Sequence, residues 1–238
     1  MQRLLALLLS IAWVPTALAA EPAAPGAQPG ARTIVLVRHG HYAPDPAADP
    51  KLGPGLSPVG VVQAKLAGAR LAGWPVRFDA TYVSPLQRAR DTAATIREDL
   101  PESRFEVLPD LEECTPPTRR ADIMAGEKPQ DLAACQAQLE RLYARHFIAS
   151  PDGDRTELMV CHGNVIRYLV TRALGVEANA WLGMSVGHAS ITRIRVEADG
   201  SMKVLSVGDV GHIAPRLQSG ATGDRELELA PMRTPPAP

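Results

Sequence analysis

The sequence is poor in aromatic side chains and in net charge. Aromatic residues make up 4% of the 238 residues, so Leu, Val, Ile and Ala must fill the interior. The formal net charge is −1, which gives no electrostatic reason to bind nucleic acid or an anionic membrane surface. With 45% hydrophobic and 21% charged residues, the composition is that of a globular protein with one sizeable core.

Cysteine is also scarce. Three cysteines, Cys114, Cys135 and Cys161, exclude a full disulfide framework, because an odd number cannot all pair. One bridge between Cys114 and Cys135 is compatible with an oxidising compartment, and three buried thiols are the alternative. Cys161 lies in an apolar strand pattern, where packing is expected rather than chemistry. The sequence leaves the redox state of Cys114 and Cys135 open.

The N-terminus resembles a secretory signal. Arg3 precedes an apolar run over residues 4–14, and Pro15 breaks that run at about half of the ~20 residues that a membrane span needs. Residues 17–19 form an A-x-A cleavage pattern. We therefore expect a cleaved signal peptide over residues 1–19, export to a periplasm and no membrane attachment afterwards. An uncleaved anchor or a buried core helix is the alternative reading.

Composition divides the remaining chain into three parts. Residues 20–32 are a Pro/Ala/Gly linker with too little apolar bulk to fold. Residues 33–215 are expected to form one domain without internal repeats. The segment 216–238 ends in RTPPAP and is expected to be a loose tail.

Within the domain, strand and helix patterns alternate. Helices are expected after Ser57-Pro58 and Ser84-Pro85, which are typical helix starts. Repeated strand–helix units imply an α/β three-layer sandwich with a mainly parallel central sheet. A C-terminal β-hairpin is expected over residues 189–209, turning at Asp199-Gly200. The strands are predicted over residues 33–38, 78–83, 104–108 and 157–161, and the helices over 56–73, 84–100, 130–149 and 164–175.

Two of the predicted strands end in the same way. One runs into Arg38, His39 and Gly40, and the other runs into His162 and Gly163. Ligands of parallel α/β folds bind beyond the carboxyl ends of the strands, so both histidines are expected at one site. The second His-Gly also opens a helix, whose free N–H groups favour an anion. A structural role is the usual explanation for a single histidine at a strand end, and the repetition favours catalysis.

These motifs resemble the histidine phosphatase superfamily, which includes the phosphoglycerate mutases. The RHG triplet at residues 38–40 is similar to its signature, Arg88 in SPLQRARDT to its second arginine, and His162 in CHGN to its second histidine. Glu113 in LEE is similar to its acidic residue. The resemblance covers about residues 33–215, and it implies a metal-independent phosphomonoesterase with no cofactor.

A closer resemblance is to the mitochondrial serine/threonine phosphatase branch of that superfamily. VRHGHY, CHGNVIRYLVTRAL and WLGMSVGHASIT are similar to its segments. The chain departs from that branch at Gly40, His41 and Cys114, and residues 20–32 lack the branch's Trp-containing assembly motif. A large oligomer is therefore not expected, and a homodimer stays open as a partner.

The resemblance implies phosphoryl transfer through a phosphohistidine. His39 would attack phosphorus, with the tautomer fixed by a hydrogen bond from its other ring nitrogen. Arg38 and Arg88 would grip the phosphoryl oxygens, since planar guanidinium groups bind phosphate with two parallel hydrogen bonds. His162 would add a third positive charge in the complex. The expected partner is a phosphorylated protein or small molecule.

Glu113 is the expected general acid, and later the base that activates water. Its neighbour Glu112 is the alternative, which sequence does not exclude. His41 and His188 are further pocket candidates, together with the glycines Gly40 and Gly163. Three other side chains are expected outside the chemistry: Arg90 and His146 in solvent, and Arg167 in a structural ion pair.

Three other functions fit parts of this pattern. A phosphoglycerate-type mutase would use the same residues, but the stretch between Glu113 and His162 offers little material for a closed lid that excludes water. A zinc site built from His39, His41 and His162 is disfavoured by the neighbouring arginines, which would repel a divalent ion. A phosphate-binding module without catalysis is disfavoured by the complete set of reactive residues.

Overall fold

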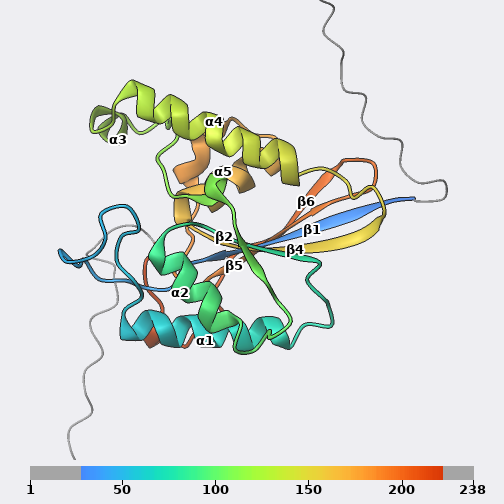
Figure 1. Cartoon of the computed structure of the whole chain (residues 1–238). Coiled ribbons are helices and arrows are strands. Elements are labelled where there is room, and N and C mark those ends of the chain that lie inside the picture. The colour runs from blue at the N-terminus through green and yellow to red at the C-terminus, as the bar shows by residue number, and fades with distance from the viewer. Residues whose placement is uncertain (1–27, 222–238) are drawn as a thin grey trace, which may run out of the picture.

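The computed structural model describes residues 28–221 and builds them around one six-stranded sheet (Figure 1). The strands are β1 (Pro29–Arg38), β2 (Ala80–Val83), β3 (Phe105–Val107), β4 (Gly153–Cys161), β5 (Ile191–Val196) and β6 (Met202–Asp209). The helices are α1 (Pro58–Ala72), α2 (Gln87–Ile96), α3 (Ala121–Ala125), α4 (Pro129–His146) and α5 (Gly163–Ala173). Three short 3-10 turns are η1 (Pro109–Leu111), η2 (Ala178–Gly183) and η3 (Pro215–Leu217).

The sheet is mainly parallel, as predicted. Its order is β3-β2-β4-β1-β5-β6. The first four strands are parallel, β5 runs antiparallel to β1, and β6 returns antiparallel to β5 as the C-terminal hairpin. Gly200 lies in the hairpin turn with a φ of 83°, a backbone region that favours glycine. The predicted α/β fold and its hairpin are confirmed.

Helices cover both faces of the sheet, with α1 and α2 on one face and α4 and α5 on the other (Figure 1). Val35 and Val37 of β1 pack in the cluster with α1 and α2, whereas Ile34 and Leu36 pack in the cluster with α4 and α5. All four side chains are buried. The unbroken apolar run of this strand follows from its burial on both faces.

The carboxyl ends of β1 and β4 mark a switch point of the topology, and we call this position the crevice. These strands are neighbours, and the helices that follow them, α1 and α5, lie on opposite faces of the sheet. Such a reversal is the usual position of a ligand site in open α/β sheets. The two His-Gly turns continue from these two strands, so the fold brings them to the same crevice.

The two predicted helix starts differ in the structure. Ser57 caps α1, and its Oγ accepts a hydrogen bond from the Gly60 N–H at 3.2 Å. Ser84 does not cap α2, which begins at Gln87 after Leu86 without a side-chain cap. The prediction for Ser84 was therefore wrong. Its buried Oγ instead lies 2.7 Å from His162 Nε2.

Several boundaries shift by a few residues. β1 begins at Pro29, so residues 29–32 are strand and not linker as expected. Residues 215–221, most of which were assigned to the tail, include η3 and pack onto the crevice. The predicted signal peptide over residues 1–19 lies outside the described residues. None of the helices within residues 28–221 combines the length and apolar character that a membrane crossing needs.

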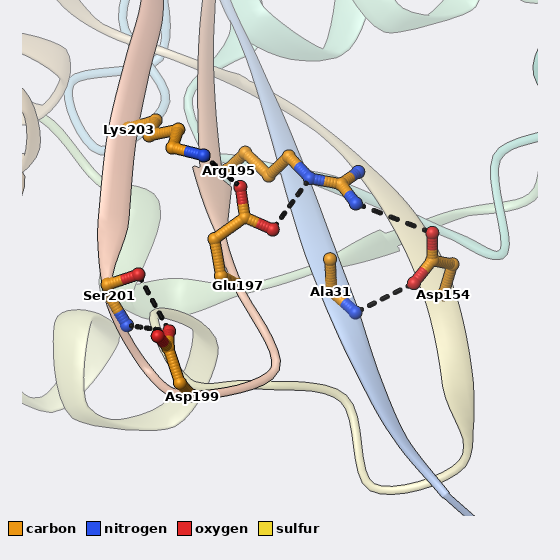
Figure 2. Close-up of polar contacts among 7 residues, drawn as sticks. All are labelled: Ala31, Asp154, Arg195, Glu197, Asp199, Ser201 and Lys203. Carbon is orange, nitrogen blue, oxygen red and sulfur yellow. Dashed lines mark hydrogen bonds and ion pairs between the residues drawn. The ribbon is translucent and has the colours of Figure 1, made fainter.

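Charged side chains pair with one another at the sheet end opposite the crevice (Figure 2). Arg195 of β5 lies 3.5 Å from a carboxylate oxygen of Asp154 and 3.2 Å from one of Glu197. Lys203 of β6 contacts Glu197 at 3.0 Å. Asp154 also accepts a hydrogen bond from the Ala31 N–H at 2.8 Å. Each cation in this network therefore has a carboxylate partner.

A buried ion cluster lies at the same end, on the face covered by α4. Glu157 of β4 is 3.1 Å from Arg32 Nη1 and 2.8 Å from His146 Nδ1, and all three residues are buried. The expectation that His146 is solvated was therefore wrong. His146 lies in the last turn of α4, where a polar residue usually faces solvent, and here it turns inward to the carboxylate.

Candidate active site

His39 lies at the centre of the crevice, directly after β1. It is 2% exposed, and its Nδ1 lies 2.8 Å from the Gly40 carbonyl oxygen, to which it donates. Its Nε2 accepts a hydrogen bond from Arg88 Nε at 3.2 Å. Burial, followed by the nearby His162 and Arg38, lowers the pKa of His39 well below its usual value. The ring is therefore neutral, and its lone pair lies on Nε2, which faces Arg88.

Gly40 lets the chain turn into the crevice. A Cβ added at this position would lie 2.5 Å from the Gly60 carbonyl oxygen, so only glycine allows this approach to α1. The Gly40 N–H donates to Thr92 Oγ1 at 3.0 Å. These contacts fix the turn that carries His39.

Arg38 reaches the crevice from the last position of β1. Its Nη1 donates to the carbonyl oxygens of Val186 and Gly220, each at 2.6 Å, and its Nη2 lies 3.1 Å from His188 Nε2. Burial lowers the pKa of Arg38 to about 10, which leaves it cationic at neutral pH. Carbonyls hold the guanidinium group without neutralising it.

Arg88 comes from the first turn of α2, as its position after the predicted helix start indicated. Its guanidinium carbon lies 4.9 Å from the centre of the Tyr42 ring, and its Nε reaches His39. Arg90, two residues later, is exposed as expected. The helix therefore turns one arginine into the crevice and the other into solvent.

His162 is fully buried on the β4 side of the crevice. The centres of the His39 and His162 rings are 5.0 Å apart. Ser84 Oγ contacts its Nε2, and its Nδ1 has no hydrogen-bond partner among the described residues. Burial, then the charges of Arg88 and Arg38, lower the pKa of His162 well below its usual value. The structure therefore holds a neutral His162.

Glu113 and Glu112 point to different surroundings. Glu112 is exposed, whereas Glu113 is partly buried and its Oε1 lacks a hydrogen-bond partner within the described residues. Burial raises the pKa of Glu113, while Arg38 and Arg88 oppose this shift. A carboxyl group with a raised pKa, influenced by the charges of two arginines, has the properties of a general acid.

His188 lies beside His39, and His41 lies beside His188. The ring centres of His39 and His188 are 5.4 Å apart, and those of His41 and His188 are also 5.4 Å apart. Burial, then the charge of Arg38, lowers the pKa of His188 to about 2. His41 Nδ1 lies 2.8 Å from Ser57 Oγ. Both predicted pocket residues are therefore brought to the site.

Sequence reasoning missed two side chains of this site. Tyr42 lies with its ring centre 5.4 Å from that of His39. Arg167 of α5 was expected in a structural ion pair, which is wrong: its Nε donates to the Met184 carbonyl and its Nη1 to Asn164 Oδ1. The i, i+4 spacing of Arg167 from Gly163 places it on the crevice side of α5, and that spacing was the available signal.

The site is therefore a cluster of positive charge around a neutral imidazole. Arg38, Arg88 and Arg167 form no ion pair with any carboxylate of the described residues. Partly buried cations without anionic partners suit an anionic ligand, and planar guanidinium groups suit phosphate in particular. Within residues 28–221, no group of three or more His, Cys, Asp and Glu side chains is arranged to hold a metal ion.

A parallel α/β sheet with a strand-end imidazole beside several arginines is an arrangement suited to binding and transferring a phosphoryl group. The chain belongs to the histidine phosphatase superfamily (branch 1), whose family model matches residues 34–116 and 115–209. These segments contain every residue of the RHG and CHGN motifs. The predicted family is confirmed.

Curated relatives extend this assignment. The chain is 37% identical over 189 residues to the mitochondrial serine/threonine-protein phosphatase Pgam5 of Caenorhabditis elegans, covering 77% of this chain and 65% of that protein. It is 33% identical over 190 residues to human PGAM5, covering 77% of this chain and 64% of that protein. The chain thus matches slightly less than two thirds of each relative.

Solved structures share the fold. A phosphoglycerate mutase from Plasmodium falciparum superposes with a TM-score of 0.53 at 25% identity, covering 75% of this chain and 91% of that one. An alpha-ribazole phosphatase from Shigella flexneri superposes with a TM-score of 0.56 at 20% identity, covering 74% and 96%. The second similarity supports the fold alone.

The comparisons also overturn one prediction. Export to a periplasm was expected from the N-terminal residues, but the curated relatives are named as mitochondrial proteins. The predicted periplasmic location is therefore wrong.

Proposed function

We propose that this chain is a metal-independent phosphatase that hydrolyses phosphate monoesters through a phosphohistidine at His39. One observation carries the proposal: the Nδ1–H of His39 is bound by the Gly40 carbonyl, which leaves the Nε2 lone pair directed into a cluster of unpaired arginines. A nucleophile with a fixed tautomer and a compensated phosphoryl charge are the two requirements of this reaction. Residues 33–215 are the proposed catalytic domain.

In the first step, His39 Nε2 attacks phosphorus and the ester P–O bond breaks. Arg38 and Arg88 bind the equatorial oxygens, whose charge is largest in the transition state. Protonated Glu113 transfers its proton to the leaving alkoxide, so an alcohol departs and phosphohistidine remains. The raised pKa of Glu113 supports this role, because it favours the protonated form.

In the second step, water attacks the phosphohistidine. The Glu113 carboxylate takes one proton from that water, the P–N bond breaks, and His39 regains its lone pair as phosphate departs. His162 is neutral in the structure because burial and two arginines disfavour its charge. A phosphoryl dianion beside it acts in the opposite direction and raises its pKa, so we expect His162 to be cationic in the complex.

A phosphorylated serine or threonine of a protein is the proposed substrate class. The names of the curated relatives, which are serine/threonine-protein phosphatases, support this choice. Small phosphate esters are the alternative partner, because the proposed chemistry needs only a phosphomonoester.

The test is an assay of the purified protein with three substrates in the presence of EDTA. We expect phosphate release from p-nitrophenyl phosphate and from a phosphoserine peptide, without loss of rate in EDTA, and no isomerisation of 3-phosphoglycerate. Isomerisation without release would identify a mutase. Loss of activity in EDTA would contradict a metal-independent mechanism.

A further inference from the structure

Glu113 lies in a segment outside the helices and strands. Residues 113–118 belong to neither helix nor strand. The Oε1 atom of Glu113 has no hydrogen-bond partner among the described residues, so this atom adds no polar anchor for the side chain. The position of this carboxyl group therefore depends on how the neighbouring main chain is attached to the rest of the domain.

Four contacts attach that main chain to α4 and α5. Gln138 Nε2 donates to the carbonyl oxygens of Glu112 at 2.8 Å and Asp110 at 3.2 Å. Asn164 Nδ2 of α5 donates to the Cys114 carbonyl at 3.1 Å. Arg141 of α4 pairs with Asp110 at 2.8 Å. All four contacts involve exposed or partly exposed groups, and water and salt weaken such contacts.

The fifth attachment is covalent. Cys114, the residue directly after Glu113, forms a disulfide with Cys135, and their Cα atoms are 5.6 Å apart. Cys135 is 3% exposed and belongs to the hydrophobic cluster that contains Leu139 and Leu142 of α4. The bridge thus ties the residue beside Glu113 to a buried position on a long helix.

We propose that the Cys114–Cys135 disulfide is a positioning element for Glu113, and that its reduction selectively slows the proton-donating step. This inference rests on the proposed function of Glu113. A dithiol would reduce the bridge by two thiol–disulfide exchanges: the S–S bond takes up two electrons and two protons to give two thiols, and the dithiol becomes a cyclic disulfide. The Glu113 segment then keeps its hydrogen bonds, the Asp110–Arg141 ion pair and the packing of Leu111 in the core, but loses its covalent attachment.

Two substrates with different leaving groups can distinguish whether the disulfide positions Glu113 or only stabilises the fold. An alkoxide from phosphoserine needs a proton when it departs, whereas p-nitrophenolate is stable without one. The value of kcat/KM reports the step in which the leaving group departs and excludes the later hydrolysis of phosphohistidine. Displaced Glu113 therefore lowers kcat/KM for the phosphoserine peptide and spares that for p-nitrophenyl phosphate.

The experiment compares oxidised protein, protein reduced with a dithiol, and the Cys114→Ser/Cys135→Ser variant. Alkylation and mass measurement establish the redox state. On reduction, we expect the ratio of kcat/KM for the phosphoserine peptide to kcat/KM for p-nitrophenyl phosphate to fall by about 10²-fold. This is the size expected when a catalytic group is misplaced by about 1 Å. Reoxidation should restore the ratio, which keeps the test valid even if the variant does not fold.

Two further variants sharpen the result. In Glu113→Gln the ratio is already changed, so reduction should add nothing, which is the non-additivity expected of coupled positions. Ala137→Gly weakens the same helix at an exposed position without touching the bridge, and should leave the ratio unchanged. An equal loss for both substrates on reduction would show that the bridge only stabilises the fold. Oxidised protein that hydrolyses neither ester would instead overturn the proposed function.

Discussion

The arginines at the two ends of the sheet have different kinds of partner. At the amino end, Arg32 and Arg195 each lie within 3.5 Å of a carboxylate. At the carboxyl end, Arg38, Arg88 and Arg167 contact carbonyls, histidines and an amide instead. A partly buried cation without a counterion can take one from a ligand. The difference fits a structural role at the amino end and the proposed phosphate site at the carboxyl end.

The largest expected effect is the loss of the nucleophile at the carboxyl end. His39→Ala removes the attacking nitrogen, so kcat should fall at least about 10⁴-fold for p-nitrophenyl phosphate. The measurement is steady-state phosphate release by protein whose folding is checked by circular dichroism. His146→Gln at the amino end is the control, and it should keep kcat. Equal losses of kcat in both variants would contradict the proposed difference in function between the two ends of the sheet.

The next effect concerns the arginines. Arg38→Lys keeps the charge but loses the planar fork, so kcat/KM should fall on the order of 10²-fold. Arg195→Lys, the matched change at the amino end, should leave kcat/KM unchanged, because Arg195 only joins two surface carboxylates (Figure 2). Steady-state kinetics on both variants checks this. Retained activity in Arg38→Lys would mean that charge alone is needed.

The amino end should respond in stability instead. Glu157→Gln leaves buried Arg32 without its carboxylate, and we expect the free energy of unfolding to fall by about 3 kcal/mol. The measurement is urea denaturation of the variant and of the unaltered protein. The value of kcat below the unfolding transition should not change. A stable variant with reduced kcat would show that the two ends are coupled.

The smallest effect is in the pH dependence. The pKa of His39 is lowered well below its usual value, and that of His188 is lowered to about 2, so both stay neutral in the fold while the unfolded chain takes up protons below about pH 6.5. Stability should therefore fall as the pH falls from 6.5, whereas the nucleophile stays unprotonated. We expect kcat/KM for p-nitrophenyl phosphate, corrected for protonation of the ester, to stay level from pH 7 to pH 5. A decline in the corrected kcat/KM centred near pH 6.5 would contradict the lowered pKa of His39.

Local patterns predicted the fold and the centre of the site. Unbroken apolar runs identify β1 and β4 because both faces of each strand are buried. The two His-Gly turns follow those strands, and the first turn of α2 holds Arg88. Each of these features depends on a few consecutive residues, so sequence alone was enough to find them.

Features that depend on distant contacts were not predictable in this way. Arg38 bonds to Gly220, 182 residues away, and Ser84 contacts His162, 78 residues away. The Ser-Pro pattern at Ser84 is that of a helix cap, and only the neighbouring strand β4 brings it the imidazole that it contacts instead. His146 was misread for the same reason, since its partner Glu157 lies on a separate strand.

The most direct test of the account is to identify the atom that carries phosphate during turnover. Protein mixed with a ³²P-labelled phosphomonoester and quenched within the first turnovers should retain label that survives alkali and is released by acid. Peptide mapping should locate that label on His39, and His39→Ala should carry none. Label on a serine, a cysteine or a carboxylate, or active protein that never retains label, would contradict the account.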